Sequence, residues 1–317
     1  MQKTVSKPYF LVGAERSGTT LLRLMLNYHP KITWCNEFEY AVDRMDNGDW
    51  PELDSYYTWL ETHRIFQDSR FAIDTNLTYS ELVNSFLCQR LVRDDKPIIG
   101  ATVHRHFDRL LKIWPDARFI HIVRDGRDVA RSCIGMGWAG NVWHGVEEWI
   151  RVEKLWKEFS QNIPADRKLE IAYEDLIVNY VDTLKKICGF IGVDYDPAML
   201  DYVNSSDYAL PEPKLIHQWK KKQSDREIQL LENRIGSMLV ERGYSLSGLA
   251  PVKVNAVDKV LLKIHSWWGK LQFRSNRLGP GLVLSYFLAR KLGITSWEKQ
   301  SLLKINDVQR KYLKKST

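Results

Sequence analysis

The stretch YFLVGAERSGTTLLRLML (residues 9–26) decides the fold of this chain. Four apolar residues lead into a short polar loop that begins with Gly13, and Leu21, Leu22, Met25 and Leu26 then recur at the helical period. A turn from a strand into a helix can bind an anion through backbone N–H groups and the helix N-terminus. We therefore predict an anion-binding loop, against the alternative of a plain connecting turn.

The spacing of the loop glycines narrows the choice of anion. Gly13 and Gly18 are separated as in the nucleoside-triphosphate loop G-x-x-x-x-G-K-[ST], but Thr19 stands at the position of its lysine. A cation lies inside the loop instead, at Arg16. The hydroxyl side chains that follow are Ser17, Thr19 and Thr20. The loop is therefore suited to a phosphate rather than to a magnesium–triphosphate.

A second strand, polar turn and helix follow at residues 118–133, RFIHIVRDGRDVARSC. Arg124 comes directly after the strand, and Ser132 lies eight residues later. Arg124 can make a charge-assisted, bidentate contact with a phosphate, and the alternative is an ion pair with Asp125 or Asp128. Both turns come at the carboxyl ends of strands, where α/β sheets bind ligands.

Strands and helices alternate along the rest of the body of the chain. Further strands are expected at residues 97–100 and 169–173, and further helices at residues 107–114, 141–159, 174–191 and from the capping box SDRE at 224–227. This order predicts an α/β, three-layer, P-loop-like fold with a central, mostly parallel sheet flanked by helices.

The composition is that of an ordinary globular protein, with 44% hydrophobic and 27% charged residues among 317. The four cysteines lie far apart, which predicts neither a zinc site nor a disulfide framework, and no metal is expected. We see no leader before the first strand and no apolar run of about 18–20 residues, so we expect a cytoplasmic protein.

The two turns resemble one family. ERSGTTLL (residues 15–22) resembles the 5′-phosphosulfate loop of sulfotransferases that use 3′-phosphoadenosine 5′-phosphosulfate (PAPS), and FIHIVRDGRDVARS (residues 119–132) resembles their 3′-phosphate motif. IAYEDL (residues 171–176) resembles a third block, and the resemblance spans roughly residues 8–245, nearest to the bacterial, tyrosylprotein and glycan-type branch. It implies PAPS as cofactor, adenosine 3′,5′-bisphosphate as product, and a catalytic domain over residues 1–250.

The resemblance also implies roles for single residues. Those expected to hold the phosphosulfate are Arg16, Ser17, Gly18, Thr19 and Thr20. Arg16 would also stabilise charge on the leaving phosphate, and Arg124 and Ser132 would hold the 3′-phosphate. Tyr173 would line the nucleotide site, against the alternative of a core tyrosine. A ligand with anionic groups at both ends of an adenosine needs two separate phosphate sites, and this chain offers two.

The general base is open between two residues. Glu37 matches the position of the catalytic glutamate in the tyrosylprotein branch, with Glu39 as a nearby competitor. That branch carries a lysine in a G-E-K-T-P-like segment, where this chain reads GATVH and has Thr102 at the lysine position. His104 follows two residues later and is the second candidate, since the ordinary pKa of histidine, about 6.5, suits a base near neutrality.

A late basic segment resembles the part of the family that closes over the cofactor. Its candidate contacts are Lys214, Lys220, Lys221 and Lys222. A lysine run before a helix is otherwise a solvated flank.

The basic character of the chain belongs to its C-terminal segment. Residues 251–317 carry 14 Lys and Arg against three acidic residues, whereas the whole chain has a net charge of +7. Residues 258–273 place apolar side chains on one helical face and lysines on the other, as in helices that lie on anionic membranes, and a second amphipathic segment covers 282–292. We favour the alternative that the apolar faces of this basic, helical extension (residues 251–317) dock on the catalytic domain.

The sequence thus predicts a PAPS-dependent sulfotransferase that moves a sulfuryl group to a hydroxyl of a carbohydrate, lipid or peptide by in-line displacement. The alternatives are a P-loop kinase that uses ATP and a non-catalytic nucleotide-binding or membrane-adaptor protein on the same fold. No nucleic-acid partner is expected. Peripheral contact with a membrane surface through residues 251–317 is an open hypothesis.

Overall fold

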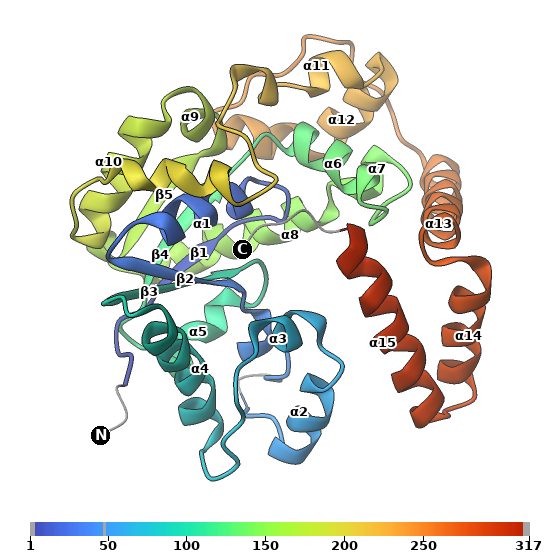
Figure 1. Ribbon diagram of the computed structural model, residues 1–317. Helices are drawn as coiled ribbons and strands as arrows, with labels where there is room; N and C mark the ends of the chain where they lie inside the picture. Colours follow the sequence, from blue (N-terminus) through green and yellow to red (C-terminus); the bar gives the residue numbers. More distant parts are fainter. Residues whose placement is uncertain (1–3, 47–48, 313–317) are drawn as a thin grey trace. The chain divides into compact units, whose positions relative to one another are not determined.

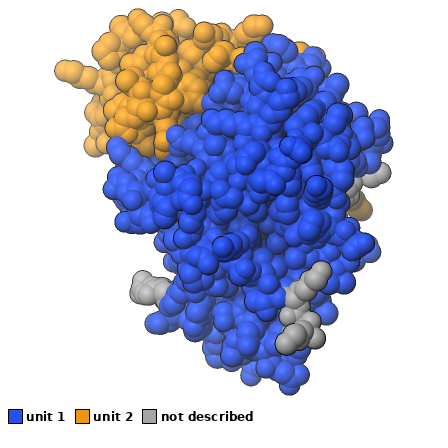
Figure 2. All heavy atoms as spheres, turned by 90° about the vertical axis from the view of Figure 1, so that its left-hand side faces the viewer, with its two compact units in different colours: residues 1–123, 152–213, 314–317 blue, residues 124–151, 214–313 orange. Residues whose placement is uncertain are grey.

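The computed structural model describes residues 4–46 and 49–312. They form two compact units, coloured separately in Figure 2. Unit 1 comprises the described residues up to 123 together with residues 152–213, and unit 2 comprises residues 124–151 and 214–312. This division reflects packing alone, so the functional boundary expected near residue 250 stays a prediction.

Unit 1 is built on a five-stranded sheet in the order β2-β3-β1-β4-β5, and all its paired strands are parallel. The strands are β1 (Tyr9–Val12), β2 (Ile32–Glu37), β3 (Ile98–Val103), β4 (Arg118–Val123) and β5 (Lys168–Ala172). The central strand β1 is buried along its whole length, because helices cover both faces of the sheet. The predicted α/β fold with a central parallel sheet is confirmed.

Unit 1 contains eight α-helices or parts of α-helices within its described residues, and several of them cover the sheet. The eight are α1 (Thr19–Tyr28), α2 (Leu53–Leu60), α3 (Arg64–Ser69), α4 (Tyr79–Asp94), α5 (Leu110–Ile113), the larger part of α8 (Glu147–Phe159), α9 (Tyr173–Val178) and α10 (Tyr180–Ile191). In Figure 1, α1 and α10 lie on one side of the sheet, and α4 and α5 on the other. This is the three-layer arrangement that the sequence predicts.

Two helices expected to be continuous are divided. Residues 141–159 form α7 (Val142–Gly145) and α8, with a break at Val146, and residues 174–191 are divided into α9 and α10 at Asn179. Asn179 has φ −125° and ψ 47°, outside the helical region. Tyr173, expected at the end of a strand, is instead the first residue of α9.

Unit 2 is helical. Its helices are α6 (Gly126–Gly135), α7, α11 (Trp219–Lys222), α12 (Asp225–Glu241), α13 (Ala256–Leu278), α14 (Pro280–Lys291) and α15 (Thr295–Tyr312). The capping box of Ser224 and Glu227 opens α12 as expected. Across the described residues, 4–46 and 49–312, no helix is both long enough and apolar enough to cross a membrane.

The C-terminal helices correct one expectation. The apolar face of α13, with Trp267 and Trp268 at its centre, does not dock: these two side chains are 54% and 59% exposed. The helix is instead held through its opposite face, where Ser266 is buried. Helical periodicity shows which residues share a face, but small side chains decided which face could approach the rest of unit 2.

Candidate active site

The loop between β1 and α1 has a backbone that few residues tolerate. Gly13 has φ +153° and a Cβ there would lie 2.4 Å from the carbonyl oxygen of Ile122. Arg16 has φ 72° and Gly18 φ 95°, both in the left-handed region. A left-handed backbone is uncommon for arginine, and such outliers are concentrated at binding and active sites.

The loop ends in a helix N-terminus with no anion of its own. Gly18 is the N-cap of α1 and has no side chain to accept the first N–H groups, and the first turn reads TTLL. Ser17 is fully buried, and among the described residues its Oγ has no hydrogen-bond partner. Burying a hydroxyl without a partner costs about 1–3 kcal/mol. An anion bound at this helix terminus would satisfy both features.

Tyr173 packs on this loop. A Cβ on Gly18 would lie 2.3 Å from Cδ2 of the Tyr173 ring, so only glycine fits beneath it. The ring is 6% exposed and starts α9, the helix that follows β5. The structure thus places Tyr173 against the loop, and the expectation that it lines the nucleotide site stays a prediction.

His104 lies under the other end of the loop. It follows β3, its side chain is buried, and its Nδ1 is 2.9 Å from the carbonyl oxygen of Gly13. A carbonyl only accepts, so Nδ1 carries the hydrogen, and Nε2 is the nitrogen that can accept a proton. The backbone N–H of His104 donates to Oε1 of Glu39 at 2.8 Å.

His104 and Glu39 form a buried, coupled pair. Burial alone would lower the pKa of His104, but the negative charges of Glu39, Glu15 and Glu37 outweigh it and raise that pKa above its ordinary value. Burial raises the pKa of Glu39 to about 7. His104 therefore takes up a proton more readily than an ordinary histidine, which suits a general base.

Glu37 is the last residue of β2 and is half-buried at the same carboxyl edge of the sheet. Near it lies Arg23, whose pKa burial lowers to about 10 while the charge of Glu37 acts in the opposite direction. Arg23 donates through Nη1 to Oδ1 of Asn36 at 2.5 Å. Unit 1 thus brings the phosphate loop and both candidate bases to one edge.

Thr102, at the position of the family lysine, links two strands of the sheet. It is buried in β3, and its Oγ1 accepts a hydrogen bond from Nε1 of Trp34 at 3.2 Å. The Trp34 ring lies over Gly100, where a Cβ would be 2.3 Å from its Cζ3. A lysine at position 102 would have to displace this ring.

In the second turn, in unit 2, arginine and aspartate side chains pair with one another. Asp125 caps α6 by accepting from the N–H of Arg127 at 2.9 Å. The Arg127 guanidinium binds Asp125 with two hydrogen bonds, of 3.0 and 2.7 Å, and Glu232 with one of 2.7 Å. Asp125 is thus held by Arg127.

Arg124 lies at the start of this turn with a side chain that is 12% exposed. Its Nη2 donates to the carbonyl oxygen of Leu215 at 3.2 Å and lies 3.5 Å from Oδ2 of Asp128. The Oδ1 of Asp128 accepts from the backbone of Trp219 at 2.7 Å. The alternative of an ion pair between Arg124 and Asp128 is therefore present in the structure. Ser132 lies on α6, half-buried.

Sequence reasoning missed polar groups on the segment that follows Leu215. In the part of the chain that the structure describes, three buried atoms there have no hydrogen-bond partner: Nδ1 of His217, Nε1 of Trp219 and Oε1 of Gln223. His217 also has φ 51°. Trp219 contacts Asp128, so this segment adjoins Arg124 within unit 2. Lys220, Lys221 and Lys222 are exposed, and Lys222 donates to Gln218 at 2.5 Å.

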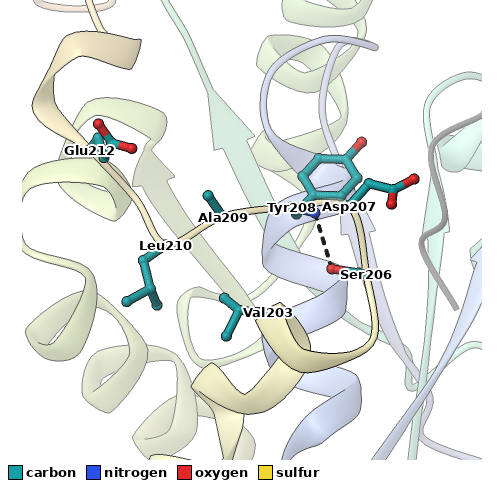
Figure 3. A pocket seen from close by; sticks show the side chains of 7 residues that line it. All are labelled: Val203, Ser206, Asp207, Tyr208, Ala209, Leu210 and Glu212. Atoms are coloured by element: carbon teal, nitrogen blue, oxygen red, sulfur yellow. Dashed lines mark hydrogen bonds between the residues drawn. The ribbon is translucent and has the colours of Figure 1, made fainter.

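A separate surface cavity of about 600 Å³ lies in unit 1 (Figure 3). It is lined by Val203, Ser206, Asp207, Tyr208, Ala209, Leu210 and Glu212. Within the lining of the cavity, the backbone N–H of Tyr208 donates to Oγ of Ser206 at 3.2 Å. Its charged side chains, Asp207 and Glu212, are acidic, so it does not suit a phosphate.

Most of the residues described above lie in the part of the chain that is similar to known proteins. The sequence profile of the Sulfotransferase family matches residues 8–197, a stretch that includes both turns, both candidate bases and Tyr173. A protein-tyrosine sulfotransferase of Drosophila melanogaster is 24% identical over 204 residues, 61% of this chain and 39% of that protein. Protein-tyrosine sulfotransferase 1 of Danio rerio is 25% identical over 205 residues, 61% of this chain and 55% of that protein.

The chain spans about half the length of the curated relatives it matches. Among solved structures, a sulfotransferase domain from the curacin biosynthetic pathway superposes with a TM-score of 0.55 at 17% identity. The match covers 77% of this chain and 100% of that domain, and it agrees with the fold of unit 1 as described above.

Proposed function

The chain belongs to the sulfotransferase family, and from this premise we propose that it transfers the sulfuryl group of PAPS to a hydroxyl of a carbohydrate, lipid or peptide acceptor. The observation that carries the proposal is the loop of residues 13–20. Its helix N-terminus has no side-chain cap, and its buried Ser17 Oγ lacks a partner among the described residues. These features fit a phosphosulfate.

The residues divide the binding of the cofactor between them. Arg16, Ser17, Gly18, Thr19 and Thr20 would hold the 5′ end, and Arg124 with Ser132 would hold the 3′-phosphate. The unpartnered Trp219 Nε1 and His217 Nδ1 support a ligand near Arg124, because each can form a hydrogen bond that the described residues do not supply. Tyr173, packed on Gly18, would line the nucleotide site.

PAPS supplies an activated sulfuryl group, so the chain has to position an acceptor, stabilise the leaving phosphate and remove one proton. In this direct displacement the bond from sulfur to the phosphate oxygen breaks as the bond from sulfur to the acceptor oxygen forms. Arg16 would stabilise the negative charge on the leaving phosphate. The acceptor proton would pass to a base at the edge of the sheet.

We propose His104 as that base, with Glu37 as the second candidate. The hydrogen bond from Nδ1 to the Gly13 carbonyl fixes the ring, so Nε2 can take the proton. The charge of Glu39 would then stabilise the imidazolium, as its effect on the pKa of His104 indicates. His104 contacts the first residue of the phosphate loop, which supports this choice.

The pH dependence of turnover distinguishes the two bases. With His104 as base, kcat rises with pH through a pKa above 6.5, and His104→Gln lowers kcat by about 10²–10⁴-fold and removes that rise. Glu37→Gln keeps the same profile in this case. If Glu37→Gln abolishes the profile and His104→Gln retains it, Glu37 is the base.

Thermal unfolding with nucleotides tests the cofactor. Adenosine 3′,5′-bisphosphate should raise the Tm by a few degrees at concentrations well above its Kd, and ADP and ATP should have much less effect. Stabilisation by ADP and ATP alone would favour the kinase alternative. Stabilisation by the bisphosphate without turnover of labelled PAPS on any acceptor would favour the non-catalytic alternative.

Tyrosine peptides belong in the panel of acceptors used to measure turnover, because the matched relatives are named protein-tyrosine sulfotransferases.

A cytoplasmic, reducing location remains a proposal. It is supported by the four cysteines, which are all buried and which form no disulfide bond within the part of the chain that the structure describes. The acceptor class is likewise a proposal, to be decided by the acceptor panel.

A further inference from the structure

Helix α13 is fixed in unit 2 by its small residues. Ser266 is buried, and its Oγ accepts from the N–H of Gly140 at 3.1 Å. One turn earlier, the carbonyl of Leu262 accepts from Nδ2 of Asn141 at 2.7 Å. One turn later, a Cβ on Gly269 would lie 2.7 Å from the Cα of Gly140. These contacts determine which side of the helix faces away from its neighbours.

The side that faces away is apolar and exposed. Its side chains, all between 49% and 66% exposed, are Val257, Val260, Leu261, Ile264, Trp267 and Trp268. They recur every three or four residues, so they form one continuous stripe along the helix. We call this stripe the α13 apolar face. Large contiguous apolar surfaces are rare on monomeric proteins and mark interaction sites.

A row of basic side chains runs along one flank of the α13 apolar face. Lys259, Lys263, Lys270 and Arg274 are spaced by four, seven and four residues, which keeps them on one line of the helix. The one acidic residue of α13, Asp258, accepts from the backbone N–H of Asn255 in the capping box at the helix start. The row therefore has no carboxylate along it on this helix.

The next helix also exposes apolar side chains. In α14, Leu284 and Phe287 are 56% and 57% exposed, and Lys291 lies 5.9 Å from the centre of the Phe287 ring. The other side of α14 packs on α15, where Ser285 accepts from Nε1 of Trp297 at 2.8 Å. Figure 1 shows α13, α14 and α15 as three successive helices. Apolar and basic side chains are thus exposed together on two of them.

We propose that the α13 apolar face and its basic row dock on an anionic lipid surface, with α13 lying in the plane of the interface. Exposed aliphatic and tryptophan side chains beside a lysine row are the features of interfacial helices, since the apolar groups enter the acyl boundary and the cations bind headgroups. The net charge of +11 over residues 251–317 is complementary to such a surface.

The same charge argues against other partners. A second copy of this chain would bring an equally basic surface against the first, which is unfavourable. A nucleic acid would use the basic row, but it would leave the aliphatic side chains exposed. Lipid is the partner that uses both.

Co-sedimentation of the full chain with vesicles tests the proposal. The protein should bind vesicles that contain 30% phosphatidylserine in phosphatidylcholine, and bind phosphatidylcholine alone at least about tenfold more weakly. Trp267→Glu with Trp268→Glu should reduce binding at least about tenfold, and Lys259→Glu, Lys263→Glu and Arg274→Glu together should reduce it about 100-fold or more. These side chains are exposed, so folding should be unchanged.

Matched variants elsewhere control for charge and for loss of tryptophan. Trp50 is 42% exposed in unit 1, and Lys185 and Lys186 are exposed on α10, so Trp50→Glu and Lys185→Glu with Lys186→Glu should leave vesicle binding unchanged. Equal binding of wild type and the α13 variants, or no binding of wild type to anionic vesicles, overturns the proposal. So does a dimer in sedimentation velocity that the tryptophan variant dissociates, or heparin binding without vesicle binding. No readout depends on PAPS, so the proposal and the proposed function can fail separately.

Discussion

The two turns of residues 13–20 and 124–132 have the same elements but opposite arrangements of charge. In the first, α1 starts at a glycine, without an acidic side chain, above a buried serine hydroxyl. In the second, Asp125 caps α6, and Asp128 lies in its first turn. The first helix terminus retains its partial positive charge, whereas the second is neutralised by its own carboxylates.

This difference separates a binding element from a structural one. Arg127 of the second turn is 2% exposed and is bound by Asp125 and Glu232, so it holds unit 2 together. Arg16 of the first turn is strained and half-buried beside the helix N-terminus. Of the second turn, we assign only Arg124 and Ser132, at its two ends, to ligand binding. Each of the following experiments tests one part of this contrast.

The largest expected effect is on folding, from Arg127→Ala. The change leaves Asp125 buried without its guanidinium, and breaking such a buried pair costs about 3–5 kcal/mol of unfolding free energy. Urea unfolding measures the loss. Arg151→Ala, which removes a 57% exposed partner of Glu148, should change stability by less than about 0.5 kcal/mol. A small effect of Arg127→Ala would mean that the second turn is not the structural one.

Arg16→Ala should have the opposite profile, with a loss of catalysis and little loss of stability. Removing a cation that stabilises the leaving phosphate should lower kcat about 10²–10³-fold. Arg16 is half-buried, whereas Arg127 is 2% exposed and bound by two carboxylates, so the loss of Arg16 should cost less unfolding free energy. Turnover of labelled PAPS and urea unfolding are measured on the same preparation. Normal kcat with reduced stability would reverse the assignment of the two turns.

Arg124→Ala tests whether the second turn keeps one ligand contact. The loss of a charge-assisted hydrogen bond to phosphate should weaken binding of adenosine 3′,5′-bisphosphate about 10- to 150-fold. Calorimetry with adenosine 5′-monophosphate, which lacks the 3′-phosphate, is the control and should show little change on mutation. Unchanged affinity for the bisphosphate would remove Arg124 from the site.

The first turn could be predicted from sequence because its signals are local. Gly13, Arg16 and Gly18 lie within six residues, and their order alone indicates a strand, an anion loop and a helix. The contact of His104 with Gly13 could not be predicted, since it depends on the register that pairs Val12 with Val103 of a strand about ninety residues later. Arg127 and Glu232 are similarly distant in sequence.

The hydrophobic periodicity of the sequence also could not predict which face of a helix docks. The periodicity of α13 correctly grouped its apolar residues on one face, but it gave the wrong docking side. What decided the side was the pair Ser266 and Gly269, which lets the helix approach Gly140 closely. Small residues contribute little to a hydrophobicity pattern, although they determine how closely two backbones can approach.

The smallest expected effect concerns β4, the strand that leads into the second turn. Its His121 lies between two carboxylates, just as two arginines of the second turn lie beside carboxylates. His121 is fully buried, with Nδ1 2.9 Å from Glu170 and Nε2 3.3 Å from Glu153, and its ring stacks on Trp156. Burial alone would lower its pKa, but Glu153 and Glu170 outweigh burial and raise it.

A raised pKa means that the stabilisation from His121 is complete below the unfolded value of about 6.5 and is lost as pH rises through the folded value. His121→Gln should therefore cost about 1 kcal/mol at pH 6 and progressively less toward pH 9, in urea unfolding at each pH. His63 provides the opposite case: burial lowers its pKa to about 4, so only the unfolded state takes up a proton below about pH 6.5, and the cost of His63→Gln should be smaller at pH 6 than at pH 9. A pH-independent cost for His121→Gln would show that folding leaves the pKa of His121 unchanged, and a cost that grows toward pH 9 would show that His121 is held neutral.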